Sequence, residues 1–161
     1  MRLSAQQSYG ADPERVHALL TDEAFLSAAA VEMGATSHRV AASPGRTAVE
    51  ATIDSPPEVR AFVGPSITLV QETRWQEPAA DGSRAGDVSI TVQGAPVSLE
   101  ATCRLAPAPA GSTLAYDGEL TVRIPVFGGA VEKAATPAIL EALEAQEAVA
   151  QRWLASGPSA H

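Results

Sequence analysis

The C-terminal part of the chain has the hydrophobic spacing of a long amphipathic helix. Apolar residues recur at i, i+3, i+4 and i+7 between Val131 and Leu154, and glutamates occupy the opposite side. Gly157 and Pro158 follow, as these residues often do past a helix end. The pattern predicts a helix from about Phe127 to Ala155, roughly 40 Å long.

Pro137 interrupts this pattern, because proline lacks a backbone donor and crowds the preceding turn. One interpretation is a single long helix that kinks at Pro137. The other is a short turn before a helix that is capped by Thr136, with Pro137 at its first position. We favour the single kinked helix. The small residues of this helix either pack in an ordinary core or leave a gap between the helix and a sheet. The alanines alone do not distinguish these two interpretations, because alanine is also the best helix former.

The N-terminal part begins with alternating apolar and polar residues, which predicts a strand at residues 2–9. Asp12-Pro13-Glu14 has the composition of a helix start, and Thr21-Asp22 ends this first helix and caps a second one. Met33-Gly34 ends the second helix. We expect His17, on the first helix, to lie at the surface.

From Ala35 onward the period of the apolar residues changes from helical to two. Turn residues separate the alternating segments, which predict six strands at about residues 36–43, 46–54, 67–77, 87–93, 97–105 and 112–124. Gly118 is a candidate bulge in the last strand. Residues 58–63 predict one helical turn between two strands. This segment either covers the mouth of a cavity or is an ordinary loop.

Short turns make sequential strands neighbours, so the predicted sheet is antiparallel. A twisted sheet of about seven strands curls, and the long C-terminal helix is the only element large enough to cover its apolar face. The expected fold class is therefore α+β, with a curved antiparallel sheet wrapped around that helix and two short helices between strands 1 and 2. We expect a single domain, residues 1–161, with a flexible tail at 155–161.

Composition narrows the classes of partner. The net charge of -8 and the absence of a basic cluster argue against nucleic acid and anionic membrane surfaces. There is one cysteine, no apolar run that would span a bilayer and no apolar leader segment at residues 1–11, which predicts a cytoplasmic protein. We expect a monomer or weak homodimer.

The sequence contains no recognisable catalytic or metal-binding set. None of the three histidines has the spacing of a metal ligand pair, and no phosphate-binding glycine loop is present, so we expect no metal and no cofactor. Cys103 is expected to be a buried, inert thiol. Gln71, Thr73, Tyr116 and Gln146 are polar residues on otherwise apolar faces, where a ligand, a water or another side chain must pair with them.

The order of elements resembles the START-like (SRPBCC) superfamily, which includes polyketide cyclases and the birch-pollen allergen family. The resemblance covers the full length, and the residues that carry it are Tyr9, Asp12-Pro13-Glu14-Arg15-Val16, Leu19-Leu20-Thr21-Asp22, Gly118-Glu119-Leu120, Ile124-Pro125-Val126-Phe127-Gly128-Gly129 and Val131-Glu132. The chain is most similar to a branch of uncharacterised, domain-of-unknown-function proteins from high-GC bacteria. The resemblance implies a helix-grip fold with a hydrophobic tunnel between sheet and helix, and it transfers no catalytic residues.

The leading hypothesis is that the chain binds or carries a hydrophobic small molecule, lipid or polyketide-like, in that cavity. The expected lining consists of thirteen residues: Val49, Ile53, Phe62, Leu69, Gln71, Trp75, Ile90, Leu99, Tyr116, Leu120, Ile139, Leu143 and Gln146. A second hypothesis is a cyclase, aromatase or hydrolase that uses the same cavity, with Tyr116, Gln71, Glu119 and Arg123 as first candidates. A third is a protein-interaction module.

Overall fold

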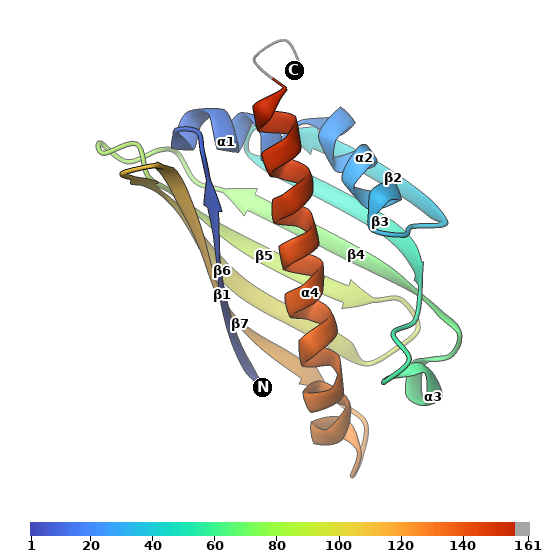
Figure 1. The fold of residues 1–161 in the computed structure, drawn as a ribbon. Coiled ribbons are helices and arrows are strands. Elements are labelled where there is room, and N and C mark those ends of the chain that lie inside the picture. Colours follow the sequence, from blue (N-terminus) through green and yellow to red (C-terminus); the bar gives the residue numbers. More distant parts are fainter. Residues whose placement is uncertain (157–161) are drawn as a thin grey trace.

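Residues 1–156, the part described by the computed structural model, form one seven-stranded sheet and four helices (Figure 1). The strands are β1 (Arg2–Tyr9), β2 (Ser37–Ser43), β3 (Arg46–Asp54), β4 (Ser66–Trp75), β5 (Arg84–Val92), β6 (Val97–Ala108) and β7 (Gly111–Val122). The helices are α1 (Pro13–Leu20), α2 (Glu23–Glu32), α3 (Arg60–Val63) and α4 (Gly128–Ala155).

The sheet is antiparallel throughout, with the strand order β1-β7-β6-β5-β4-β3-β2. Consecutive strands from β2 to β7 are neighbours, as short connections require. β1 closes the order by pairing with β7, with Ala5 opposite Tyr116. β1 and β2 are therefore the two edges of the sheet.

Helix α4 runs along the inner face of the curved sheet, and the smaller helices lie toward the two ends of the sheet (Figure 1). α1 and α2 are next to the C-terminal half of α4, while α3 lies at the opposite end of the sheet. The side chains of Asp12 and Asp22 cap α1 and α2 by accepting hydrogen bonds from the backbone N–H groups of Arg15 and Phe25. The expected fold class is confirmed.

α4 is one helix that continues through Pro137, which confirms the single-helix interpretation. Proline at this position leaves the carbonyl of Lys133 without the helical N–H that would normally reach it. One residue earlier, the Thr136 hydroxyl donates to the carbonyl of Glu132 at 2.9 Å. Thr136 is therefore part of the helix rather than the cap of a separate one.

Side chains of α4 hold the free edge of β1. The backbone N–H of Ser8 donates to the Glu147 carboxylate at 2.6 Å, and the Gln151 amide donates to the Ser8 carbonyl at 2.5 Å. An unpaired strand edge would otherwise expose these backbone groups. At the same end of the helix, Arg15 donates to the Leu154 carbonyl at 2.7 Å. These contacts fix the C-terminal half of α4 against β1 and α1.

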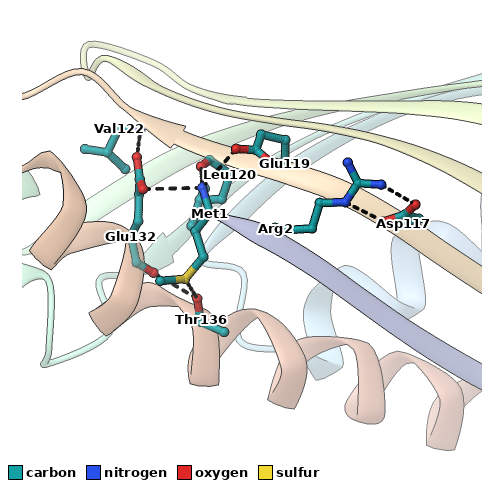
Figure 2. Close-up of polar contacts among 8 residues, drawn as sticks. All are labelled: Met1, Arg2, Asp117, Glu119, Leu120, Val122, Glu132 and Thr136. Carbon is teal, nitrogen blue, oxygen red and sulfur yellow. Dashed lines mark hydrogen bonds and ion pairs between the residues drawn. The ribbon is translucent and has the colours of Figure 1, made fainter.

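The start of β1 fixes the other half of α4 (Figure 2). The Met1 amine donates to the Leu120 carbonyl at 2.6 Å and to the carboxylates of Glu119 and Glu132 at 3.2 and 3.3 Å. Glu132 also accepts the backbone N–H of Val122 at 2.9 Å. This N–H, more than the amine, holds the pKa of Glu132 below its usual value, although partial desolvation opposes it. Both ends of α4 are thus tied to the β1–β7 side of the sheet.

Most predicted element bounds are confirmed within three residues, and three details are corrected. β5 begins at Arg84 rather than Asp87, and β6 continues to Ala108 rather than ending at residue 105. Gly118 marks no bulge, since the register of β7 continues through it on both sides. The predicted flexible tail overlaps the end of α4 at Ala155, and from residue 157 onward it lies outside the described residues.

Candidate functional site

The inner face between the sheet and α4 is closely packed at both ends and loosely packed between them. Near α1 and α2, Leu105, Leu114 and Phe25 are completely buried. Near α3, Val122 and Val131 belong to a second buried cluster. Between these two cores, no residue of α4 from 132 to 148 is fully buried. That segment spans roughly 25 Å of helix.

Most strand residues on the inner face between the two cores are also only half-buried, although Val92 on β5 is buried. The half-buried residues are aliphatic and occur on four adjacent strands: Val49, Ala51, Ile53, Ile67, Leu69, Ile90 and Leu99. A close-packed interior would bury such side chains as fully as it buries Leu105. Solvent therefore reaches an apolar surface that lies beneath a helix.

One pocket of about 30 Å³ opens where the inner face meets α1 and α2. This volume accommodates about two water molecules. Residues from eight elements line it, with α1 and α2 contributing one residue each and β3 to β7 and α4 the rest: Leu20, Leu26, Thr47, Val49, Gln71, Thr73, Trp75, Val88, Cys103, Tyr116 and Gln146.

The structure brings five of the thirteen expected lining residues together in this pocket: Val49, Gln71, Trp75, Tyr116 and Gln146. Six others lie outside the pocket on the inner face or on α4, and none of them is fully buried: Ile53, Leu69, Ile90, Leu99, Ile139 and Leu143. Leu120 is buried at 2% exposure. Phe62 is 43% exposed and lies beside Phe127, with ring centroids 6.0 Å apart.

Six lining residues were not among the thirteen expected, although Thr73 was one of the polar residues noted on apolar faces: Leu20, Leu26, Thr47, Val88, Thr73 and Cys103. Alternation placed Thr47, Thr73, Val88 and Cys103 on apolar strand faces. The pairing register decides which of those residues meet, because Thr73 stands opposite both Thr47 and Val88. That register depends on contacts between strands far apart in the sequence.

Hydrogen-bonding groups without a protein partner face this pocket. Thr47 and Thr73 are 5% and 6% exposed and stand opposite each other. No side-chain hydrogen bond joins either hydroxyl to another described residue, and the same holds for the Gln71 amide and the Tyr116 hydroxyl. None of the four is a polar atom sealed within the core, so they are open to the pocket that they line. Buried polar groups are nearly always paired, so these four have capacity for a ligand or water.

A comparison with protein families assigns the chain. The family described as "Protein of unknown function (DUF2505)" matches residues 4–154. The chain belongs to this family. No curated protein matches the chain.

Solved structures with the same fold cover nearly all of this DUF2505 chain. TTHA0849 from Thermus thermophilus is 20% identical, with a TM-score of 0.64 over 98% of this chain and 99% of that one. A STAR-related lipid transfer protein from Xanthomonas axonopodis is 14% identical, with a TM-score of 0.63 over 94% and 84%. Ara h 8.0201 is 10% identical, with a TM-score of 0.57 over 93% and 97%. At these identities the likeness establishes the fold alone, and it is the helix-grip fold that the resemblance implied.

The two titratable groups that line the DUF2505 pocket are both held in their neutral forms. Burial raises the pKa of the Cys103 thiol to about 12, and the nearby Asp87 carboxylate adds to the shift. Burial also raises the pKa of Tyr116, with smaller contributions from Cys103 and Tyr9. A protonated thiol and phenol are poor nucleophiles and poor bases near neutral pH. The expectation that Cys103 is a buried thiol is confirmed.

A buried hydrogen-bonded chain connects β1 to the middle of α4. The Tyr9 hydroxyl donates to Gln7 Oε1 at 2.7 Å, and Gln7 Nε2 donates to the Leu143 carbonyl at 2.9 Å. A longer contact of 3.5 Å joins Gln7 Nε2 to the Gln146 side chain, which lines the pocket. Gln7 therefore positions the pocket-facing side of α4.

His17 is buried at 5% exposure, so its predicted surface position is wrong. α1 lies across the end of the sheet, where the His17 ring meets Trp75 edge-to-face with centroids 5.2 Å apart. Neither ring nitrogen has a hydrogen-bond partner in the described structure. Burial, followed by the charge of Arg84, lowers the pKa of His17, and the Pro44 carbonyl opposes this only in part.

The other charged candidates lie away from the pocket. Glu119 is exposed and binds the Met1 amine, and Arg123 is exposed beyond the end of β7. Within residues 1–156, no group of three or more His, Cys, Asp or Glu side chains is placed to hold a metal ion. In the same part of the chain, no helix has the length and apolar character needed to cross a bilayer.

Proposed function

We propose that this DUF2505 protein binds or carries a hydrophobic small molecule, lipid or polyketide-like, between the inner face of its sheet and α4. The observation that supports this most strongly is the burial along α4. Val131 and Val149 are packed in buried clusters, yet the whole segment between them stays partly exposed while it faces an apolar sheet. Apolar surface left open to solvent beneath a helix gains free energy when a ligand covers it.

The shared fold supports the same class of function. One solved structure with this fold is a STAR-related lipid transfer protein. A fold alone does not carry an activity, so the support comes from the combination of that fold with the exposed inner face.

The size of the pocket determines how a ligand would lie. About 30 Å³ is far below the roughly 300–1,000 Å³ of an ordinary small-molecule site. The pocket therefore holds one end of the ligand. The remainder lies along the half-buried residues beyond it, such as Leu69, Ile90 and Leu99.

Uptake of Nile red, a neutral apolar dye, tests this proposal, together with native mass spectrometry of protein purified without detergent. Ala51 faces inward on β3, opposite Leu69, and Ala48 faces outward on the same strand, opposite Glu72. Ala51→Phe fills space under α4 and should abolish dye uptake. Ala48→Phe is the matched control and should leave it unchanged.

Two results would contradict the proposal. Absence of both a copurified small molecule and dye uptake would remove its basis. Equal uptake by the Ala51→Phe and Ala48→Phe proteins would place the dye elsewhere on the molecule.

An enzyme of cyclase, aromatase or hydrolase type is the alternative use of this site, and it has less support. Catalysis by proton transfer needs a group whose pKa lies near the working pH. The two titratable groups at the pocket, Cys103 and Tyr116, have pKa values raised away from neutrality. Glu119 and Arg123 lie outside the pocket.

The interaction-module alternative has one observation in its favour. Val126 is 95% exposed at a positive φ of 71°, next to the 54%-exposed Phe127, which contacts Phe62. Sedimentation over a range of concentrations tests self-association through this surface. Our proposal includes a single domain that is a monomer or weak homodimer in the cytoplasm, so sedimentation should show no tight dimer.

A further inference from the structure

The unpartnered polar groups of the pocket gather at one end of the inner face. Thr47 and Thr73 form a cross-strand pair, and Gln71 follows Thr73 on the same face of β4. Tyr116 reaches the pocket from β7. Together they offer three hydroxyls and one amide, all of which both donate and accept hydrogen bonds.

No formal charge lines this end of the inner face. Among the described residues that line the pocket, none is Asp, Glu, Lys, Arg or His. The charged residues of the same strands alternate to the outer face, where Glu72 pairs with Arg46 at 2.5 Å. A charged ligand group would therefore lose its hydration here without gaining a counter-charge.

The polarity of the inner face falls along the sheet from this end toward α3. The pair Thr47 and Thr73 is followed on the same face by Val49 with Gln71, then by Ala51 with Leu69, and then by Ile53 with Ile67. On β5 and β6, Ile90 and Leu99 stand in the same cross-strand row as Val49 and Gln71. Beyond Gln71 the inner face of β3 and β4 is formed by carbon alone and stays half-buried. Val92 on β5 is buried opposite Leu69, and the exposed His38 on the edge strand β2 stands opposite Ala51.

We propose that the ligand is an amphiphile with a neutral hydroxyl or carbonyl head, bound by Thr47, Thr73, Gln71 and Tyr116, and with an apolar chain that points toward α3. This inference rests on the proposed function and adds the chemical class and the orientation of the ligand. A neutral head can use every unpartnered group of the pocket. A carboxylate, phosphate or ammonium head would be buried without an opposite charge.

A chain-matched series of compounds tests the head group. Decane, decanol, decanoate and decylammonium are each used to displace Nile red from the protein at neutral pH. Decanol should bind at least about 10-fold more tightly than decanoate or decylammonium, because the transfer of an unpaired charge costs more than the ≈ 1.4 kcal/mol that tenfold represents. Decanol should also bind more tightly than decane.

Two double variants locate the head. Thr47→Val with Thr73→Val removes the inner hydroxyls without a large change of shape and should weaken decanol binding by about 3- to 10-fold, the usual effect of one net hydrogen bond. Thr52→Val with Thr68→Val is the matched control, since these threonines pair across the same two strands and satisfy each other at 2.8 Å. The control should leave decanol binding unchanged. Tyr116→Phe gives a second, independent reduction.

The outcomes separate this inference from the proposed function. If decanoate or decylammonium binds as tightly as decanol, the neutral-head inference is overturned while hydrophobic binding stands. Equal decanol affinity in the inner and outer threonine variants overturns the assigned head position. Failure of all four compounds and of Nile red to bind overturns the proposed function itself.

Discussion

Thr47 and Thr73 stand directly opposite each other on β3 and β4, yet their hydroxyls are not hydrogen bonded to each other. Thr52 lies five residues after Thr47 on β3 and faces outward, opposite Thr68 on β4. The hydroxyls of this outer pair are hydrogen bonded to each other at 2.8 Å. The two pairs differ in the face of the sheet that they occupy. Only the inner pair is left free to bind something that is not part of the chain.

The inner threonine pair should reduce the stability of the ligand-free protein. Replacing both residues, Thr47→Val with Thr73→Val, removes two buried hydroxyls that lack protein partners. We expect the free energy of unfolding to rise by about 1 kcal/mol, because these hydroxyls make no protein hydrogen bond and each valine buries an apolar methyl group in place of a hydroxyl. Thermal unfolding measures this as an increase of about 2–4 °C in Tm.

The outer pair is the control for that measurement. Thr52→Val with Thr68→Val removes both partners of one hydrogen bond, which is close to neutral. A loss of stability in the inner variant larger than in the outer one would show that the inner hydroxyls are already satisfied in the free protein.

Gln7 should be among the most sensitive polar residues of the chain. It is 2% exposed and connects the Tyr9 hydroxyl to the Leu143 carbonyl. Gln7→Leu leaves the buried Tyr9 hydroxyl without its acceptor, so we expect a loss of about 2–3 kcal/mol in a urea unfolding titration. Gln6→Leu, at the neighbouring exposed position, should change stability by less than about 0.5 kcal/mol. Equal effects of the two substitutions would contradict the assigned role of Gln7.

His17 should make stability depend on pH. The pKa of this histidine is lowered in the folded state, so the unfolded chain takes up the proton first as the pH falls. Its stabilising contribution is complete above the unfolded pKa of about 6.5 and is lost progressively below it. Urea unfolding at about pH 7.5 and about pH 5.5 should show the decrease, ahead of most carboxylate titrations.

The variant His17→Phe keeps an aromatic ring against Trp75 and removes the titrating group. It should lose less stability between the two pH values than the unmodified protein. His38→Gln, at an exposed position on β2, is the control and should keep the full decrease. An unchanged pH dependence in His17→Phe would assign the effect to another group.

Pro137 should cost stability without a compensating contact. It lies inside α4 and its ring is exposed. Pro137→Ala restores one backbone hydrogen bond, and proline is about 3 kcal/mol less favourable than alanine within a helix. We expect a gain of about 1–3 kcal/mol, measured by urea unfolding. Ala145→Pro, at an exposed position of the same helix, should cause a comparable loss, and a neutral Pro137→Ala would mean that the helix has adapted to the proline.

Local sequence patterns predicted the elements of this fold well. The alternation of residues 2–9, the capping residues Asp12 and Asp22 and the helical spacing after Phe127 each depend on near neighbours in the chain. Such signals survive folding because the caps and the period are satisfied within each element.

Contacts between distant elements could not be read in the same way. The helical pattern of α1 gives no sign that it lies across the end of the sheet, where it buries His17 against Trp75. A glycine within a strand pattern, such as Gly118, suggests a bulge, but the structure gives this glycine another role. A Cβ at this position would come within 2.8 Å of the Ala101 Cβ, so glycine permits the close approach of β6 and β7.

The sequence pattern indicates which side chains face inward, but it does not locate the pocket. Alternation correctly selected the inner-facing side chains, including Gln71 and Tyr116. It could not show that the pocket is confined to the end near α1 and α2, because that depends on the register that joins Thr47 to Thr73. Phe62, expected at the cavity, instead contacts Phe127 at the far end.

Intermolecular nuclear Overhauser effects between decanol and the methyl groups of the protein test the central claim most directly. The account predicts contacts from the alkyl chain to inner methyls of Leu69, Ile90 and Leu99, and none to Val70, which faces outward on β4. Contacts confined to the exposed Val126, or the absence of any contact at saturating decanol, would contradict it.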